Sequence, residues 1–313
     1  MKIVFDAHIP FLLEAVQKGW PQVEICPMEP EVIDAATVRN ADVLVVRTRT
    51  KVNEVLLAGS SVQLVCTATI GFDHIDTAYC ESHGIRWMSC PGCNAQAVCD
   101  YIEEAIEEIQ NSSPTIGIVG VGHVGSLVAK MAAHRGMKVL LNDPPKGIGV
   151  SLDFIAQNCD IITFHVPLDQ TTYHLCDEAF LSQCKPNALI INAARGGVVD
   201  ERALLRSGHL FILDTWEKEP NIDPEVLAKA QLASMHIAGY SVEGKRNASQ
   251  MCLDTIAEQF GLPKIDISGF RYLNISNKKG DSAPGWISRI SYQLKADPTA
   301  FEALRKAYPL RGV

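Results

Sequence analysis

The sequence predicts an α/β protein made of two Rossmann-like, doubly wound parallel-sheet domains with a short C-terminal α/β extension. Short apolar runs, typical of buried strands, alternate with helical patterns along most of the chain. This alternation forms two successive series, with a long helical pattern between them. The length of 313 residues also suits two domains, because single cores rarely grow beyond about 250–300 residues.

The first series occupies the N-terminal part of the chain. Its strand-like runs lie at residues 2–5, 23–26, 43–46, 62–66 and 85–88. The turn signal Pro91-Gly92 ends the series, and residues 95–109 then place apolar side chains at helical spacing with glutamates opposite. We interpret this segment as a long helix that crosses between domains.

The second series begins after that helix. Its strand-like runs lie at residues 115–120, 137–143, 160–166, 188–193, 210–215 and 231–238. Residues 242–261 again have a helical pattern, with inward positions expected at Met251, Leu253, Ile256 and Phe260. After Pro263 the composition turns polar and rich in turn residues, before one more amphipathic stretch at 299–308. The predicted domains are therefore 1–92 with 240–262, then 93–239, and a C-terminal region at 263–313.

Composition and charge exclude several classes of protein. With 47% hydrophobic and 20% charged residues, the chain has the composition of a soluble globular protein. A net charge of -8 argues against a general nucleic-acid or anionic-membrane binder, so an anionic ligand would need a local cationic pocket. The first residues lack the pattern of a signal peptide, and no run of 18 apolar residues occurs. We therefore expect a cytoplasmic protein that contacts neither nucleic acid nor membrane.

Ten cysteines are scattered along the chain, and without a secretory signal we expect reduced thiols. Cys90 and Cys93 form a C-x-x-C sequence, for which a redox pair is the alternative to a structural role. No second C-x-x-C completes a zinc site, and we predict no metal.

A glycine motif gives the strongest local signal for a ligand. Gly120, Gly122 and Gly125 form G-x-G-x-x-G directly after a strand-like run and at the start of a helical pattern. Glycines there permit a tight turn and let backbone N–H groups at the helix N-terminus approach a pyrophosphate. Asp143 ends the next run, 18 residues after Gly125, where a carboxylate binds ribose hydroxyls and repels a 2′-phosphate. This context predicts NAD(H) binding; the alternative is a tight packing turn.

Three polar residues follow strand-like runs further along the chain. Arg195, Glu219 and His236, taken singly, could be a surface arginine, a solvated glutamate and a core histidine. Together, at the carboxyl ends of parallel strands, they suggest an oxidoreductase site. A histidine paired with a carboxylate can take a hydroxyl proton near neutral pH, and an arginine can bind a substrate carboxylate through two hydrogen bonds.

The order of glycine motif, aspartate, arginine, glutamate and histidine resembles that of the D-2-hydroxyacid dehydrogenases over residues 1–262. The stretches VRTRTKVNEVLLAG, TATIGFDHID, PGCNAQAV and HIAGYSVEGK resemble the branch of this family that oxidises a four-carbon phosphorylated 2-hydroxy acid. Phosphoglycerate and glycerate dehydrogenases have related but different residues at each place, and they are the alternative among enzymes. The alternative that is not an enzyme is a binding protein that senses NAD(H), like the family's corepressors.

The resemblance implies a role for each site residue. Arg195 would bind and polarise the carboxylate and carbonyl end of the substrate, Glu219 would orient the imidazole, and His236 would exchange the proton. The implied cofactor contacts are Gly120, Gly122, His123, Val124, Gly125, Asp143, Val166, Ala193, Ala194, Arg195, Asp214 and Gly239. The implied substrate contacts are Thr48, Thr69 and Tyr240.

The resemblance also assigns roles to the domains. Residues 1–92 with 240–262 would bind the substrate, and residues 93–239 would bind NAD. Candidate cations for the substrate phosphate are Arg47, Arg49, Lys51, Lys245 and Arg246. A larger C-terminal domain forms the dimer in the enzymes that this chain resembles, so we expect a homodimer formed through a shortened region at 263–313.

Overall fold

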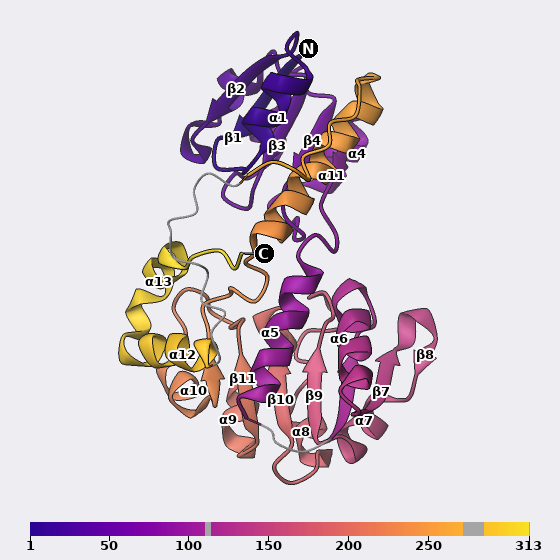
Figure 1. Cartoon of the computed structure of the whole chain (residues 1–313), viewed down its shortest axis with the longest axis vertical. Coiled ribbons are helices and arrows are strands. Elements are labelled where there is room, and N and C mark those ends of the chain that lie inside the picture. The colour runs from indigo at the N-terminus through magenta and orange to yellow at the C-terminus, as the bar shows by residue number, and fades with distance from the viewer. Residues whose placement is uncertain (110–113, 272–284, 313) are drawn as a thin grey trace. The chain divides into compact units, whose positions relative to one another are not determined.

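The chain forms two compact units, each built on a mainly parallel sheet (Figure 1). The computed structural model describes residues 1–109, 114–271 and 285–312. The first unit comprises Met1–Asn94, Ser241–Ile275 and Gly312–Val313, and the second comprises Ala95–Tyr240 and Ser276–Arg311.

The first unit contains a five-stranded parallel sheet in the order β2-β1-β3-β4-β5. Its strands are β1 (Lys2–Asp6), β2 (Glu24–Met28), β3 (Val43–Val46), β4 (Leu64–Thr67) and β5 (Arg86–Met88). All side chains of β3 and β4 are buried, as expected for central strands covered on both faces. This strand order is that of a flavodoxin-like sheet.

Helices of the first unit follow the strands in alternation. They are α1 (Leu12–Gly19), η1 (Pro30–Val32), α2 (Ala35–Val38), α3 (Glu54–Leu57), α4 (Thr77–Ser82) and, much later in the chain, α11 (Val242–Phe260). Helix α11 begins at Ser241, whose Oγ accepts the Gly244 N–H at 2.9 Å, and ends at Gly261 with a φ of 64°. Beyond it, the Pro263 carbonyl accepts the indole N–H of the buried Trp20, which ties this segment to the first unit.

The second unit contains a seven-stranded sheet in the order β12-β11-β10-β9-β6-β7-β8. Its strands are β6 (Thr115–Val119), β7 (Lys138–Asp143), β8 (Ile148–Gly149), β9 (Ile161–Phe164), β10 (Leu189–Asn192), β11 (Leu210–Leu213) and β12 (Leu232–Ala233). The order reverses between β6 and β9, which is the point where doubly wound sheets bind ligands. Only the short β8 runs antiparallel to its neighbour among the described strands.

Helices cover both faces of this second sheet. They are α5 (Ala95–Glu107), α6 (His123–His134), η2 (Pro144–Lys146), α7 (Leu152–Asn158), α8 (Glu178–Gln183), η3 (Gly196–Val198), α9 (Glu201–Ser207), α10 (Pro224–Lys229), α12 (Trp286–Ala296), η4 (Pro298–Ala300) and α13 (Phe301–Ala307). Helices α5 and α6 lie side by side, and α12 packs along the edge strand β12 (Figure 1). The Ser291 hydroxyl on α12 accepts the Ala233 N–H at 3.0 Å, so this helix covers an otherwise open sheet edge.

The predicted fold class is confirmed, and three local expectations are corrected. The run at 231–238 gives a strand only at Leu232–Ala233, so His236 lies in the loop after the strand. On α11, Leu253 and Ile256 are buried as predicted, whereas Met251 and Phe260 are only half-buried. The named elements of the C-terminal extension are helices, and α12 had not been predicted.

Within the described ranges, none of the helices combines the length and the apolar character that a membrane crossing requires.

Candidate active site

The glycine loop between β6 and α6 combines tight packing with an open helix start. Gly120 has a φ of 90°, and a Cβ there would lie 2.6 Å from the His165 carbonyl oxygen. A Cβ on Gly125 would lie 1.9 Å from the Gly120 carbonyl oxygen, so both glycines permit close backbone contacts. A Cβ on Gly122, by contrast, would meet no atom within 4 Å, and no side chain caps the helix there. This open N-terminus, continued by His123 and Val124, fits a pyrophosphate.

Asp143 ends β7 beside this loop. Its Oδ2 accepts the Val121 N–H at 2.8 Å, and the Lys146 ammonium lies 3.6 Å from the same oxygen. Lys146 also donates to the Val121 carbonyl at 2.8 Å. The carboxylate therefore links the glycine loop to the end of β7, which is the place where a ribose hydroxyl donor fits.

Two further segments predicted to contact NAD lie at neighbouring strand ends. Val166 follows β9, and its Cγ1 would lie 2.8 Å from a Cβ on Gly120, so the side chain packs against the glycine loop. After β10, the buried Asn192 shapes the turn that carries Ala193 and Ala194. Asn192 accepts the Ala194 N–H at 3.1 Å and donates to the Arg195 carbonyl at 2.8 Å. The Asn192 side chain is a structural contribution that the sequence analysis missed.

Glu219 and His236 form a direct pair. Nδ1 of His236 lies 2.8 Å from Oε2 of Glu219, and Oε1 of the same carboxylate accepts the Trp216 N–H at 2.9 Å. Burial alone would raise the pKa of the Glu219 carboxyl, but the hydrogen bond and charge of His236, followed by the Trp216 N–H and more weakly by Arg305, lower that pKa below its usual value. An ionised Glu219 accepts a hydrogen bond from the Nδ1–H of a neutral imidazole, and Nε2 is then the basic nitrogen.

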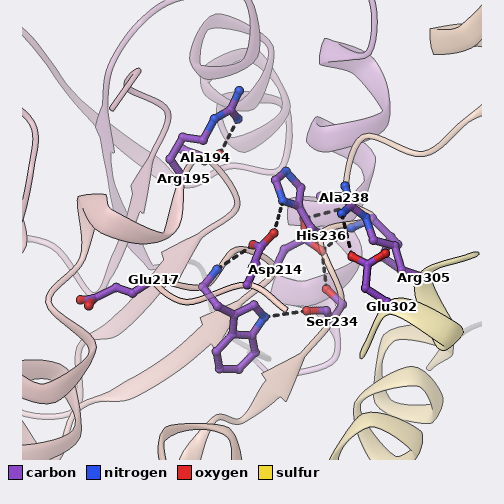
Figure 2. Close-up of polar contacts among 12 residues, drawn as sticks. Ala194, Arg195, Asp214, Glu217, Ser234, His236, Ala238, Glu302 and Arg305 are labelled. Carbon is purple, nitrogen blue, oxygen red and sulfur yellow. Dashed lines mark hydrogen bonds and ion pairs between the residues drawn. The ribbon is translucent and has the colours of Figure 1, made fainter. Parts of the chain in front are cut away.

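Arg195 lies apart from His236, as Figure 2 shows. Its guanidinium donates to the Ala194 carbonyl at 2.8 Å, and among the described residues it contacts neither Glu219 nor His236. The three residues predicted to be catalytic therefore form one bonded pair and one separate cation, all within the second unit.

Asp214 holds the loop that carries His236. The buried carboxylate accepts hydrogen bonds from the Ser234 hydroxyl at 2.6 Å, the Ile237 N–H at 2.8 Å and the Ala238 N–H at 3.0 Å. His236 itself has a φ of 58°, a left-handed conformation that is uncommon outside glycine and that hydrogen bonds on both sides maintain. Asp214 was predicted as a cofactor contact, which stays a prediction; the structure shows that its carboxylate anchors the loop of His236.

The end of the same loop meets the C-terminal segment of the chain. Gly239 and Tyr240 are half-buried, and the Tyr240 phenol oxygen accepts a hydrogen bond from Nε of Arg305 at 3.0 Å. The sequence analysis missed Arg305, because 65 residues separate the two side chains.

The other two predicted substrate contacts belong to the first unit. Thr48 is exposed after β3, and Thr69 follows the neighbouring strand β4, so both lie at the carboxyl edge of that sheet. The Thr69 hydroxyl donates to the Gly71 carbonyl at 2.9 Å and lies 2.7 Å from the Thr67 hydroxyl. Their contact with substrate stays a prediction.

The candidate phosphate cations differ in how far they are already engaged. Arg47 forms two hydrogen bonds with the buried Asp6 carboxylate, at 2.7 and 3.0 Å. Arg49 lies 3.5 Å from Glu31, and the guanidinium of Arg246 stacks on the Phe11 ring. Lys51 is exposed and Lys245 half-buried. Asp6 therefore holds Arg47 in place at the end of β3, beside Thr48.

The C-x-x-C cysteines lack the properties of a redox pair. All ten cysteines are free, and Cys90 is fully buried, with its Sγ donating to the carbonyls of Thr67 and Ala248. The hydrogen bond with Cys252 and burial raise the pKa of Cys90 far above its usual range, and burial raises the pKa of Cys93 to about 12. Reactive cysteines have lowered values instead, so the redox interpretation is not supported.

Among residues 1–109, 114–271 and 285–312, no group of three or more histidine, cysteine, aspartate or glutamate side chains could hold a metal ion.

Comparison with curated proteins identifies the family. An erythronate-4-phosphate dehydrogenase from Bacteroides fragilis is 43% identical over 341 aligned residues, covering 99% of this chain and 97% of its own. The chain belongs to the erythronate-4-phosphate dehydrogenase family. Other members of this family are 41% identical in Porphyromonas gingivalis and 39% identical in Pseudomonas fluorescens, each over 99% of this chain and 92% of their own.

Domain and fold comparisons agree with this family. Residues 95–247 match the NAD-binding domain of the D-isomer specific 2-hydroxyacid dehydrogenases. The fold also matches an NAD-bound 3-phosphoglycerate dehydrogenase from Entamoeba histolytica, with a TM-score of 0.70, 24% identity and coverage of 85% of this chain and 98% of that one. A D-lactate dehydrogenase from Aquifex aeolicus, solved with NAD and lactic acid, gives a TM-score of 0.63 at 24% identity, covering 83% and 96%. NAD is therefore the cofactor of this enzyme.

The family relationship corrects one expectation about its extent. Residues 1–262 had been expected to carry the resemblance, but an alignment over 99% of the chain includes the C-terminal segment as well. The tail that holds Arg305 is thus a regular part of the family's chain.

Proposed function

We propose that this enzyme oxidises 4-phospho-D-erythronate to (R)-3-hydroxy-2-oxo-4-phosphooxybutanoate, a step in the biosynthesis of pyridoxal 5′-phosphate. The observation that carries this proposal is the full-length identity of 36–43% to erythronate-4-phosphate dehydrogenases. The bonded pair of Glu219 and His236 supports it, because oxidation of a hydroxyl group requires a base.

In the proposed reaction His236 removes the hydroxyl proton. Glu219 accepts a hydrogen bond from Nδ1–H of His236. The proton of the substrate C2 hydroxyl therefore goes to Nε2. The negative charge of Glu219 then stabilises the imidazolium that forms. When bound, NAD+ supplies the hydride acceptor for C2.

Arg195 and three hydroxyl-bearing residues complete the proposed substrate contacts. The Arg195 guanidinium offers several N–H donors to the substrate carboxylate and to the carbonyl that develops at C2. Thr48 and Tyr240 donate to further substrate oxygens, and the Thr69 hydroxyl, which already donates to the Gly71 carbonyl, accepts from a substrate hydroxyl. The proposed phosphate cations are Arg47, Arg49, Lys51, Lys245 and Arg246, of which Arg47 already binds the Asp6 carboxylate.

The proposed cofactor contacts lie along the carboxyl ends of neighbouring strands in the second unit. Gly120, Gly122, His123, Val124 and Gly125 hold the pyrophosphate and Asp143 binds the ribose. Val166, Ala193, Ala194, Arg195, Asp214 and Gly239 surround the remaining part of the dinucleotide.

The enzyme is further proposed to act in the cytoplasm as a homodimer formed through its C-terminal region, 263–313. Sedimentation of the intact chain at several concentrations tests the dimer, and a concentration-independent monomer mass would exclude it.

The experiment for the function is an assay of purified protein at 340 nm with NAD+ and either 4-phospho-D-erythronate or 3-phospho-D-glycerate. We expect faster turnover of the erythronate. Equal or faster turnover of phosphoglycerate would refute the assignment. Tight NADH binding without turnover of any 2-hydroxy acid would instead favour a binding protein.

A further inference from the structure

Two arginines of the C-terminal segment form hydrogen bonds with the loop that carries His236 and Tyr240. Arg305, on α13, donates from Nε to the Tyr240 phenol oxygen at 3.0 Å. Arg311 donates from Nε to the Tyr240 carbonyl at 3.1 Å, and its Nη2 donates to the carbonyls of Ala97 and Ala238. Figure 2 shows Arg305 and Glu302 reaching from the C-terminal segment towards Ala238 and His236.

Arg305 is placed where its charge acts on this loop. The Arg305 side chain is 28% exposed, and its Nη1 lies 3.4 Å from Oε1 of Glu302 on the same helix. The guanidinium also lies 5.7 Å from the centre of the Tyr240 ring. The positive charge also helps to keep the pKa of Glu219 low. This effect on Glu219 is the smallest of those that act on its pKa, so the direct hydrogen bond to the Tyr240 phenol is the main contact of Arg305 with the loop.

The chemistry of the hydrogen bond sets its direction. A guanidinium group can only donate, so the Tyr240 oxygen is the acceptor and the phenol proton is directed to a different acceptor. A substrate that carries a carboxylate and a phosphate offers such acceptors. A nearby cation strengthens donation from the phenol to an anionic oxygen.

Arg311 provides the rigid support for this arrangement. Burial lowers the pKa of its guanidinium, which nevertheless binds several backbone carbonyls and stacks 5.1 Å from the centre of the Trp286 ring on α12. The backbone at Ile237–Tyr240 is therefore held from one side by Asp214 and from the other by Arg311.

We propose that Arg305 is a positioning residue of the active site, which holds the Tyr240 phenol as a hydrogen-bond donor to an anionic oxygen of the substrate. This inference rests on the proposed function for the identity of that substrate. It gives the C-terminal segment a direct part in catalysis, separate from any part in dimer formation.

A double-mutant cycle on the full-length enzyme tests the proposal, with Arg305→Gln, Tyr240→Phe and the double variant. A hydrogen bond to a charged group contributes about 1.5–3 kcal/mol. Arg305→Gln should therefore raise KM for 4-phospho-D-erythronate by about tenfold or more, with a smaller change in kcat. The double variant should resemble Tyr240→Phe alone, because Arg305 acts through the phenol.

Three controls separate this role from a merely structural one. Arg305→Lys, which keeps the charge, should raise KM less than Arg305→Gln, and Lys306→Gln, on an exposed position of the same helix, should leave KM unchanged. NADH affinity, measured by fluorescence, should stay at the wild-type value in all variants. A loss from Arg305→Gln that is equally large in the Tyr240→Phe background, or one that includes NADH affinity, would overturn the proposal.

The wild-type assay keeps the two proposals distinguishable. If the wild type prefers another 2-hydroxy acid, the proposed function fails, and the cycle is run with the preferred substrate. If the two substitutions in that cycle then change KM independently, so that their fold-changes multiply in the double variant, the positioning role of Arg305 is overturned as well.

Discussion

Gly196 packs directly against the backbone of Trp216: a Cβ on this glycine would lie 2.0 Å from both the carbonyl carbon and the carbonyl oxygen of Trp216. Gly196 follows Arg195, while the Trp216 N–H binds the carboxylate of Glu219. This close contact fixes the loop of Arg195 against the loop of Glu219.

Replacing Gly196 with alanine should therefore damage both stability and activity. The added methyl group would clash with backbone atoms, which cannot move away as the end of a flexible side chain can. Such overpacking lowers folding stability by about 1–3 kcal/mol or more. We expect a lower midpoint in chemical denaturation and a loss of kcat. Gly197→Ala is the matched control, since its Cβ would meet only side chains, at 3.3–3.4 Å. Equal effects of the two substitutions would contradict the argument.

Removal of the His236 imidazole should lower turnover while leaving NADH binding intact. We expect His236→Ala to reduce kcat by about 10²-fold or more, the range for loss of a general base. Glu219→Gln keeps the shape but loses the charge that supports the imidazolium, and it should reduce kcat by about tenfold. Steady-state kinetics with NADH titrations measure both. Wild-type turnover by His236→Ala would exclude this residue as the base.

Asp143→Asn should weaken the preference for NAD+ over NADP+. The amide oxygen can still accept the Val121 N–H, but the charge that repels a 2′-phosphate is gone, and Lys146 remains beside that position. We expect the ratio of kcat/KM for the two cofactors to fall towards equality. Adding Lys146→Gln should restore part of the preference. An unaltered ratio in Asp143→Asn would rule out the ribose assignment.

A buried carboxyl near the loop of Glu219 should make stability depend on pH. Glu201 accepts the Glu217 N–H at 2.7 Å, and burial raises its pKa to about 7. Its unfolded value is about 4.3, so the folded state binds more protons between these values and stability falls as pH rises through that window. Above pH 7 the cost in folding stability reaches at most about 4 kcal/mol. In urea denaturation, the Glu201→Gln variant should therefore be more stable than the wild type at pH 8 but not at pH 4. A gain in stability of equal size at both pH values would refute this prediction.

Short-range patterns predicted the glycine turn between β6 and α6 and the end of β7, because these parts follow one another along the chain. Strand, glycines, helix and Asp143 are contiguous, and the packing of Gly120 and Gly125 explains why no other residue suits those positions. His236 was harder to place. The apolar run around it suggested a strand, but β12 ends at Ala233 and the histidine adopts a left-handed conformation.

Contacts between distant segments gave no signal in the sequence. Arg305 and Arg311 belong to the C-terminal segment whose helix α12 packs on β12, and 65 or more residues separate these arginines from Tyr240. Neither periodicity nor motif spacing reports on such pairs, since both describe neighbours along the chain.

The loop of His236 depends on Asp214, and this dependence can be separated from cofactor binding. Ser234→Ala removes one donor to the Asp214 carboxylate and also the hydroxyl that lies 2.8 Å from the buried Tyr101 phenol. Asp214→Asn goes further, because one of its oxygens becomes an NH2 group facing the N–H of Ile237 or Ala238. The NH2 group then faces a backbone N–H, and neither donor has an acceptor, which costs about 1–3 kcal/mol of folding stability. We expect kcat to fall slightly in Ser234→Ala and strongly in Asp214→Asn, with hydrogen exchange at the Ile237 and Ala238 amides accelerating in the same order. If Asp214→Asn instead weakens NADH binding while those amides stay protected, the carboxylate serves the cofactor and not the loop.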